Sequence, residues 1–143
     1  MRLYLDTEFN GHGGPLISMA LVSPDGPTFY EVQELLCQID PWVQENVYPV
    51  LGKEDVLPVE FRALFHAFIT QFREPTIYCD WHADAAHFCN MLAGPDYGTS
   101  LDFACRIMIL NTPPGAIVSV TPHNALADAR ALMKWHEPMQ VAA

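Results

Sequence analysis

Positive charge is scarce in this sequence. Seven Lys and Arg residues stand against seventeen Asp and Glu residues, which leaves a formal net charge of −10. Proteins that grip long duplexes neutralise phosphates with a broad basic surface, so this balance disfavours that class of nucleic-acid-binding protein. It is compatible with an enzyme that holds only the end of a strand through metal ions, because such a site needs few basic contacts.

Long apolar runs are missing as well. No stretch approaches the roughly 18 consecutive apolar residues that span a membrane. Asp6 and Glu8 interrupt the segment in which a secretory signal would need its apolar core. We therefore expect a cytoplasmic protein that makes no contact with membranes.

The cysteines lack the paired spacing of a metal or redox motif. The four cysteines are Cys37, Cys79, Cys89 and Cys105. None forms a C-x-x-C pair, and three of them fall within apolar segments. We expect buried, reduced thiols rather than disulfides or a zinc site.

The sequence does contain enough apolar residues for one core. Half of its 143 residues are hydrophobic, with no internal repeat and no low-complexity tract, so we expect a single domain spanning 1–143. Three apolar segments, 2–8, 15–23 and 27–33, come first and have short links, one of them the turn signal P-D-G. They predict three strands in an antiparallel meander.

Helical and strand patterns alternate in the rest of the chain. Apolar residues within 58–73 recur with helical spacing, which predicts an amphipathic helix packed on the sheet. Its expected core stripe is Phe61, Leu64, Phe65, Phe68, Ile69 and Phe72. The other expected elements are a short helix at 40–51 with Asp40 as N-cap, a buried strand at 75–79, a helix at 84–93, a strand or a strand running into a helix at 100–110, a loop at 111–122 and a last helix from about Asn124 to His136. This order predicts an α/β fold with a mixed sheet.

Two acids end the first predicted strand. Asp6 and Glu8 flank Thr7, and residues two apart in a strand project from the same face. Neighbouring carboxylates repel each other, which makes it costly to ionise both. A solvated strand end explains such a pair. A bound divalent cation explains it as well, but it requires further carboxylates elsewhere in the chain.

Further acids occur at two later positions. Asp80 and Asp84 stand where a buried strand leads into a helix, and His123 and Asp128 open the last helix. The ordinary alternatives are a helix N-cap for either of the first two and a polar helix-start cluster for the others. Taken with the first pair, these acids form an oxygen-rich set without sulfur, which suits Mg²⁺ or Mn²⁺. Two such ions stabilise the attacking and leaving oxygens in phosphoryl transfer, and a histidine beside them serves as general base.

The order of these motifs resembles that of a known family. D-x-E on the first strand, an Asp after a mid-chain strand and H-x(4)-D near the C-terminus are the pattern of the DEDDh 3′–5′ exonucleases, which include RNase T and polymerase proofreading domains. The segments DTEF, LISMALVSPDG, WVQENVYPVL and HNALADAR look most similar to a small bacterial and phage branch of exoribonucleases typified by a mycobacterial enzyme. The resemblance covers essentially the whole chain. It implies an RNase H-like fold, with a central mixed five-stranded sheet flanked by helices, and hydrolysis of single-stranded RNA 3′ ends to nucleoside monophosphates.

The resemblance also implies roles for individual residues. Asp6, Glu8, Asp84 and Asp128 would bind two ions of Mg²⁺ or Mn²⁺. His123 would deprotonate the attacking water. The catalytic set implied by the resemblance is therefore four acids and one histidine.

Other parts of the site follow the family less closely. By resemblance, Thr7 and Phe9 would border the terminal nucleotide, with Phe9 either stacked on its base or sugar or packed in the core. Asp84 is preferred to Asp80 as the ligand, because the acid of the family stands where the helix begins. The commoner pattern of the family has Asn at position 80 and a bulky residue in place of Ala83. This chain is also shorter than the mycobacterial type, chiefly before the last helix.

Other interpretations use the same residues differently. A mononuclear zinc hydrolase could be built on Asp80, His82, Asp84 and His87, but the two histidines are five apart, which departs from the i, i+4 spacing of paired helical ligands. A non-catalytic nucleic-acid-binding domain is a third reading. The sequence does not distinguish RNA from DNA, so a 3′–5′ exodeoxyribonuclease is the nearest alternative. Many members of the family are dimers, so a homodimer is allowed.

Overall fold

The centre of the molecule is a β-sheet. The structure, a computed structural model, describes residues 1–94 and 98–141. The strands are β1 (Arg2–Phe9), β2 (Leu16–Val22), β3 (Thr28–Val32), β4 (Thr76–Cys79) and β5 (Arg106–Ile109). Their spatial order is β3-β2-β1-β4-β5; β1, β2 and β3 form an antiparallel meander, and β4 runs parallel to both β1 and β5. The predicted meander and the mixed five-stranded sheet are confirmed.

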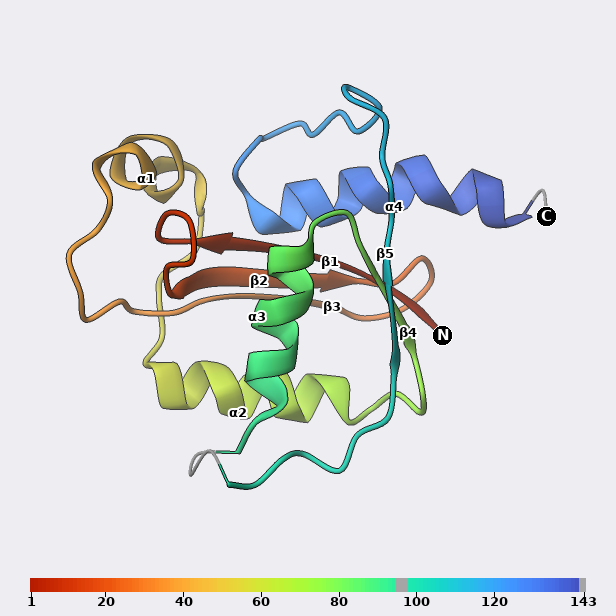
Figure 1. Ribbon diagram of the computed structural model, residues 1–143, viewed down its shortest axis with the longest axis horizontal. Helices are drawn as coiled ribbons and strands as arrows, with labels where there is room; N and C mark the ends of the chain where they lie inside the picture. The colour runs from red at the N-terminus through yellow and green to blue at the C-terminus, as the bar shows by residue number, and fades with distance from the viewer. Residues whose placement is uncertain (95–97, 142–143) are drawn as a thin grey trace.

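Helices cover both faces of this sheet (Figure 1). They are α1 (Pro41–Asn46), the short 3-10 helix η1 (Tyr48–Val50), α2 (Pro58–Ile69), α3 (His82–Leu92) and α4 (Ala125–Val141). α2 and α3 pack aromatic side chains such as Phe61 and Phe88 against one face. α4 packs on the other face through Ala125 and Ala129, and α1 and η1 cover the same side. The chain is therefore an α/β protein with its sheet between two helical layers, as predicted.

The core stripe of α2 is mostly the expected one. Phe61, Phe65 and Ile69 are fully buried. The prediction for Leu64 is wrong, because its side chain is 39% exposed. At about 100° per residue, Leu64 points roughly a quarter turn away from the middle of the buried stripe.

Several element boundaries differ from the predicted ones. The helix expected at 40–51 is divided, since α1 ends at Asn46 and η1 follows, with Pro49 unable to donate a backbone hydrogen bond. The helix expected at 84–93 begins earlier, at His82. The last helix continues past His136 to Val141 although it contains Pro138. Within the segment 100–110, the regular structure is the strand β5 alone.

The prediction for the cysteines is wrong in part. All four are free thiols, but only Cys79 is buried. Cys105 is half-buried, and Cys37 and Cys89 are exposed. Hydrophobic neighbours in sequence do not bury Cys89 because it lies on the outer side of the amphipathic helix α3.

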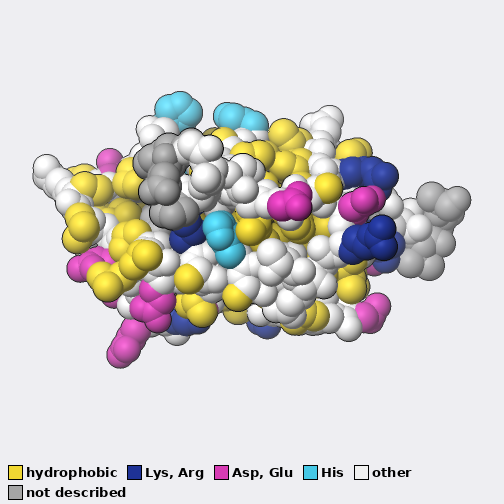
Figure 2. Space-filling model, turned by 90° about the horizontal axis from the view of Figure 1, so that it is seen from below, with side chains coloured by type: hydrophobic (Ala, Val, Ile, Leu, Met, Phe, Trp, Pro, Cys, Tyr) yellow, Lys and Arg dark blue, Asp and Glu magenta, His cyan; other side chains and the backbone are white. Residues whose placement is uncertain are grey.

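The surface agrees with the scarcity of positive charge. Figure 2 shows the side of the molecule that carries α2, where the blue Lys and Arg side chains occur in small separate groups among apolar and acidic ones. No helix in the described ranges is both long and apolar enough to cross a membrane.

Candidate active site

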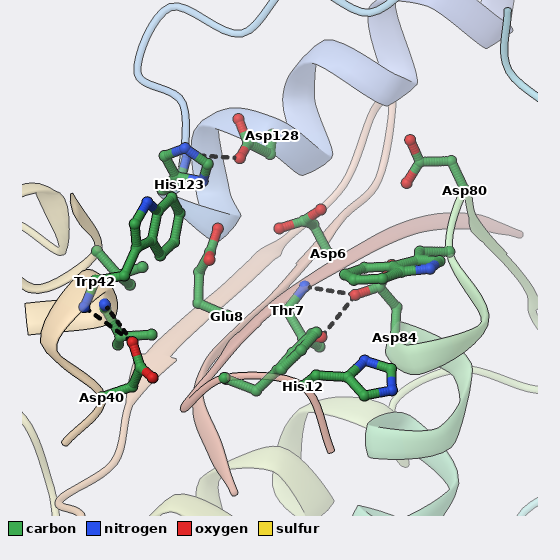
Figure 3. A pocket seen from close by; sticks show the side chains of 15 residues that line it. Asp6, Thr7, Glu8, His12, Asp40, Trp42, Asp80, Asp84, His123 and Asp128 are labelled. Atoms are coloured by element: carbon green, nitrogen blue, oxygen red, sulfur yellow. Dashed lines mark hydrogen bonds between the residues drawn. The ribbon is translucent and has the colours of Figure 1, made fainter. Parts of the chain in front are cut away.

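Five carboxylates converge on one pocket at an edge of the sheet (Figure 3). The parallel strands β1 and β4 end at this edge, and α3 and α4 begin there. The pocket has a volume of about 610 Å³. Besides Asp40, which caps α1, its acids are Asp6, Glu8, Asp80, Asp84 and Asp128. The four acids expected to bind metal thus lie together, and Asp80 lies with them.

Asp6 and Glu8 share a face of β1, as their spacing predicts. In the ladder with β2, Asp6 stands opposite Ala20 and Glu8 opposite Ser18. Figure 3 shows both carboxylates directed toward the start of α4. The register shifts directly after Glu8, so the regular alternation of the strand ends at the pocket.

Asp84 reaches the pocket from the first turn of α3. Its side chain is only 2% exposed. Its Oδ1 accepts two hydrogen bonds from Thr7, one from the backbone nitrogen at 3.1 Å and one from Oγ1 at 2.6 Å. The N-cap position of α3 is Trp81, so an N-cap role for Asp80 or Asp84 is excluded. The contact with Thr7 instead ties the helix to the middle strand of the sheet.

His123 and Asp128 meet at the start of α4. The backbone nitrogen of His123 donates to Asp128 Oδ2 at 3.0 Å, and this turn requires a left-handed backbone at His123 with φ of 66°. The imidazole ring lies edge-on against Trp42, with 5.0 Å between ring centroids. Asn124 caps the helix by accepting from the nitrogen of Ala127 at 3.0 Å. His123 and Asp128 therefore face one pocket, as expected.

The acids form two groups of ligand atoms that share one residue. Oxygens of Asp6, Asp80 and Asp84 lie within 4.8 Å of one another, and so do oxygens of Asp6, Glu8 and Asp128. The Oδ1 atom of Asp128 is buried without a hydrogen-bond partner among the described residues, which is costly for a carboxylate unless a cation is bound. All these donors are hard oxygens, so the residues present fit Mg²⁺ or Mn²⁺.

The electrostatics of the pocket also favour a cation. Burial, with Asp84 and Glu8 close by, raises the pKa of Asp6 well above its ordinary value. Burial raises the pKa of Glu8 to about 8, helped by Asp128 and Asp84. Burial likewise raises the pKa of Asp84 to about 7, against the hydrogen bonds from Thr7 that lower it. Because each anion is costly here, divalent cations bound in the pocket would favour the ionised carboxylates.

Aromatic side chains form the walls of the pocket. Phe9 is only partly buried, and its ring centroid lies 5.5 Å from that of Trp81 and 5.0 Å from that of His87. Trp42 and Trp81 are 53% and 47% exposed although both line the pocket. Phe9 therefore belongs to the pocket wall and not to the core, so the core alternative is wrong.

Sequence reasoning did not predict several of the pocket residues, among them one acid and two tryptophans. The predicted ligand set does not include Asp80, and the sequence patterns do not place Trp42 or Trp81 at the site. The position of Asp80 directly after a buried strand was the available indication, since the ends of parallel strands meet at one edge. Thr7 lines the pocket, but its hydroxyl proton is committed to Asp84, so contact with a substrate stays a prediction.

The alternative zinc site has no support in the geometry. Among the described residues, the groups able to hold a metal contain neither His82 nor His87. His87 lies against Phe9, and His82 is exposed. No protein-family model and no curated protein matches the chain. The function is therefore argued from the chemistry of this pocket.

Proposed function

We propose that this protein is a metal-dependent 3′–5′ exoribonuclease that hydrolyses single-stranded RNA 3′ ends to nucleoside monophosphates. In this proposal it has an RNase H-like fold and works in the cytoplasm. One observation carries the proposal. Two groups of three carboxylates share Asp6 and face one pocket, with all ligand oxygens of each group within 4.8 Å. A carboxylate shared between two ion positions would hold two cations side by side, as in the two-metal sites that catalyse in-line phosphoryl transfer.

The carboxylates would hold two Mg²⁺ or Mn²⁺ ions. Bound there, the ions would supply Lewis-acid stabilisation of the attacking and leaving oxygens of the scissile phosphodiester. Asp6 would contribute to both positions, with Asp80 and Asp84 on one side and Glu8 and Asp128 on the other. Thr7 keeps Asp84 oriented by donating two hydrogen bonds to Oδ1, which leaves Oδ2 for the pocket.

His123 would accept a proton from the attacking water. Its ring lines the pocket, and its backbone is fixed to Asp128. The ring packs edge-on against Trp42, so a rotation about the side-chain bonds toward the carboxylates would accompany substrate binding. General bases are often poorly aligned without substrate and reach their working geometry only in the complex.

The aromatic walls favour a nucleotide as substrate. Every base offers a flat π-face, and stacking on aromatic side chains holds single-stranded nucleic acid without sequence preference. Phe9 and Trp81 form one wall of the pocket, and Trp42 stands on the side of His123. Thr7 borders the same space. RNA is preferred to DNA in this proposal on the family resemblance alone.

One assay tests polarity, sugar and metal together. Single-stranded RNA and DNA oligomers carrying a label at either the 5′ or the 3′ end are incubated with Mg²⁺, Mn²⁺ or EDTA. We expect a ladder of shortened products from 5′-labelled RNA, immediate release of a labelled mononucleotide from 3′-labelled RNA, and no reaction in EDTA. Faster shortening of DNA would favour the exodeoxyribonuclease. Full activity in EDTA, or no cleavage of either polymer with any metal, would refute the proposal.

A further inference from the structure

A second cleft lies beside the start of α4, next to the active-site pocket. It has a volume of about 450 Å³. Among its lining residues are Val118, Val120, Asn124, Leu126, Arg130 and Lys134. None of these lines the active-site pocket. In Figure 1 the loop before α4 arches over this helix. The residues that line the cleft come from that loop, from η1 and from the beginning of α4.

The cleft contains two of the few cations in the chain. Arg130 and Lys134 are four residues apart in α4 and therefore share a helix face. Within the described ranges, neither side chain makes an ion pair or hydrogen bond. By contrast, Arg2 pairs with Glu137 and Lys53 with Glu31. Two adjacent cations without partners are an uncommon feature on a chain with a net charge of −10.

Apolar side chains stand next to these cations. Val118 and Val120 are 80% and 92% exposed on the loop, and Leu126 is half-buried on the helix. The cleft thus combines positive charge with uncovered apolar surface. A single-stranded nucleic acid matches this combination, because its phosphates require cations while its unpaired bases and sugars offer apolar faces.

The wall between the two sites is short and held in place. Asn124 lines the second cleft, while its neighbour His123 lines the active-site pocket. The side chain of Asn124 caps α4 and also donates to the carbonyl of Val50 at 2.7 Å, so this wall is fixed to both α4 and η1. A strand whose last nucleotide lies in the pocket needs to pass only this segment to reach Arg130.

We propose that the second cleft binds the phosphodiester backbone of the substrate strand upstream of its 3′-terminal nucleotide, through Arg130 and Lys134. The inference rests on the proposed function for its substrate. It explains how a strongly acidic protein holds a polyanion, because the strand is neutralised where it leaves the carboxylate pocket. Only a strand longer than one or two nucleotides would reach this cleft and gain affinity from it.

The cleft is tested directly by measuring how tightly the protein binds a 12-nucleotide RNA with a 5′ fluorophore. Binding is followed by fluorescence anisotropy in Ca²⁺ at several salt concentrations. We expect the double variant Arg130→Ala/Lys134→Ala to weaken binding about tenfold. The dependence of log Kd on log salt should become shallower by about 1.4, since each phosphate contact on a single strand contributes about 0.7. A dinucleotide should bind equally to the wild type and the variant.

Two matched variants separate this cleft from general charge effects. Arg130→Lys/Lys134→Arg keeps both charges and should retain wild-type affinity and salt slope. Arg73→Ala/Arg106→Ala removes two cations flanking the beginnings of β4 and β5, at the sheet edge opposite the active site, and should change the slope little. Equal weakening by this control, or no change in Arg130→Ala/Lys134→Ala, would overturn the inference. Because the readout is binding, it stands apart from the hydrolysis assay that tests the proposed function.

Discussion

Thr7 and Asp84 show how a single contact sets the geometry of the pocket. Asp84 is nearly fully buried, and one of its oxygens takes both donors that Thr7 offers. Asp80 is only half-buried, and no described side chain fixes its carboxylate. The two acids of this motif therefore differ in how firmly they are positioned, although both belong to one ligand group.

This difference predicts a ranking of substitutions. Asp84→Asn should abolish metal-dependent turnover, because it removes an oriented anionic ligand from the buried side of the pocket. Asp80→Asn should retain most of the turnover, because the residue is loosely held and Asn keeps one oxygen. Thr7→Val, which removes only the hydroxyl donor, should cost about 10- to 100-fold, as is typical when a partner of a ligand is lost. Steady-state hydrolysis of RNA measures all three, and the opposite order for the two acids would show that Asp80 is the principal ligand.

His123 gives the second prediction at this scale. His123→Ala should slow turnover by about 10² to 10⁴, the usual contribution of a general base. Binding of Mn²⁺ should be largely unchanged, because the ion ligands are carboxylates. Unchanged turnover, or loss of Mn²⁺ binding in His123→Ala, would contradict the role of base.

The sequence predicted the acidic residues of the pocket better than the aromatic side chains that line it. Asp6 and Glu8 were predictable because a strand has a fixed period of two. Trp81 was not, because its place depends on α3 beginning at His82, two residues before the pattern indicated. Trp42 approaches His123 through tertiary packing between segments far apart in the sequence, which no local spacing reveals.

At the scale of elements, small residues bring α4 close to the sheet. Ala125 and Ala129 are fully buried against Ala20 and Val22 of β2. Alanine at these contacts lets the helix axis approach the strands closely. Since Asp128 lies in the first turn of the same helix, this packing sets the height of the carboxylate above Asp6.

Enlarging this contact tests the packing. Ala129→Leu should destabilise the protein by about 1–3 kcal/mol, the usual cost of overpacking a core, and should reduce turnover by displacing Asp128. The exposed Ala63→Leu on α2 is the matched control, and it should leave stability within about 0.5 kcal/mol. Urea unfolding and RNA hydrolysis provide the two readouts. A neutral Ala129→Leu would show that α4 is not closely packed here.

The elements themselves were largely predictable, and their ends were not. Apolar segments with short links and a turn signal predicted the meander, and the spacing of Phe61 and Phe65 predicted α2. The continuation of α4 past His136 was missed because Pro138 normally ends a helix. That proline removes a hydrogen bond to the carbonyl of Lys134, an exposed residue where water replaces the lost donor.

At the scale of the whole molecule, the acidic pocket makes stability depend on pH. Carboxyls of the unfolded chain have pKa values of about 4. In the folded chain burial raises the pKa of Glu8 to about 8 and that of Asp84 to about 7. Between these values the folded state binds more protons than the unfolded state, so the free energy of unfolding falls as pH rises.

The metal-free protein should therefore melt at a lower temperature at pH 8 than at pH 5.5. We expect a difference of at least about 4 °C, which corresponds to roughly 1 kcal/mol for a domain of this size. Mg²⁺ should raise Tm more at pH 8 than at pH 5.5, because fewer protons have to be displaced from the ligands. Thermal unfolding with and without EDTA measures both effects. The Glu8→Gln/Asp84→Asn variant should show a weaker pH dependence, and a wild type more stable at pH 8 without metal would contradict the account.

The central claim is that the carboxylate pocket binds two divalent ions for phosphodiester hydrolysis. Calorimetric titration of the metal-free protein with Mn²⁺, in the presence of a nucleoside monophosphate, tests it most directly. The account predicts two bound ions per chain in the wild type, loss of both in Asp6→Asn because Asp6 belongs to both ligand groups, and retention of both in the exposed control Asp25→Asn. Absence of Mn²⁺ binding to the wild type, or unchanged binding in Asp6→Asn, would contradict it.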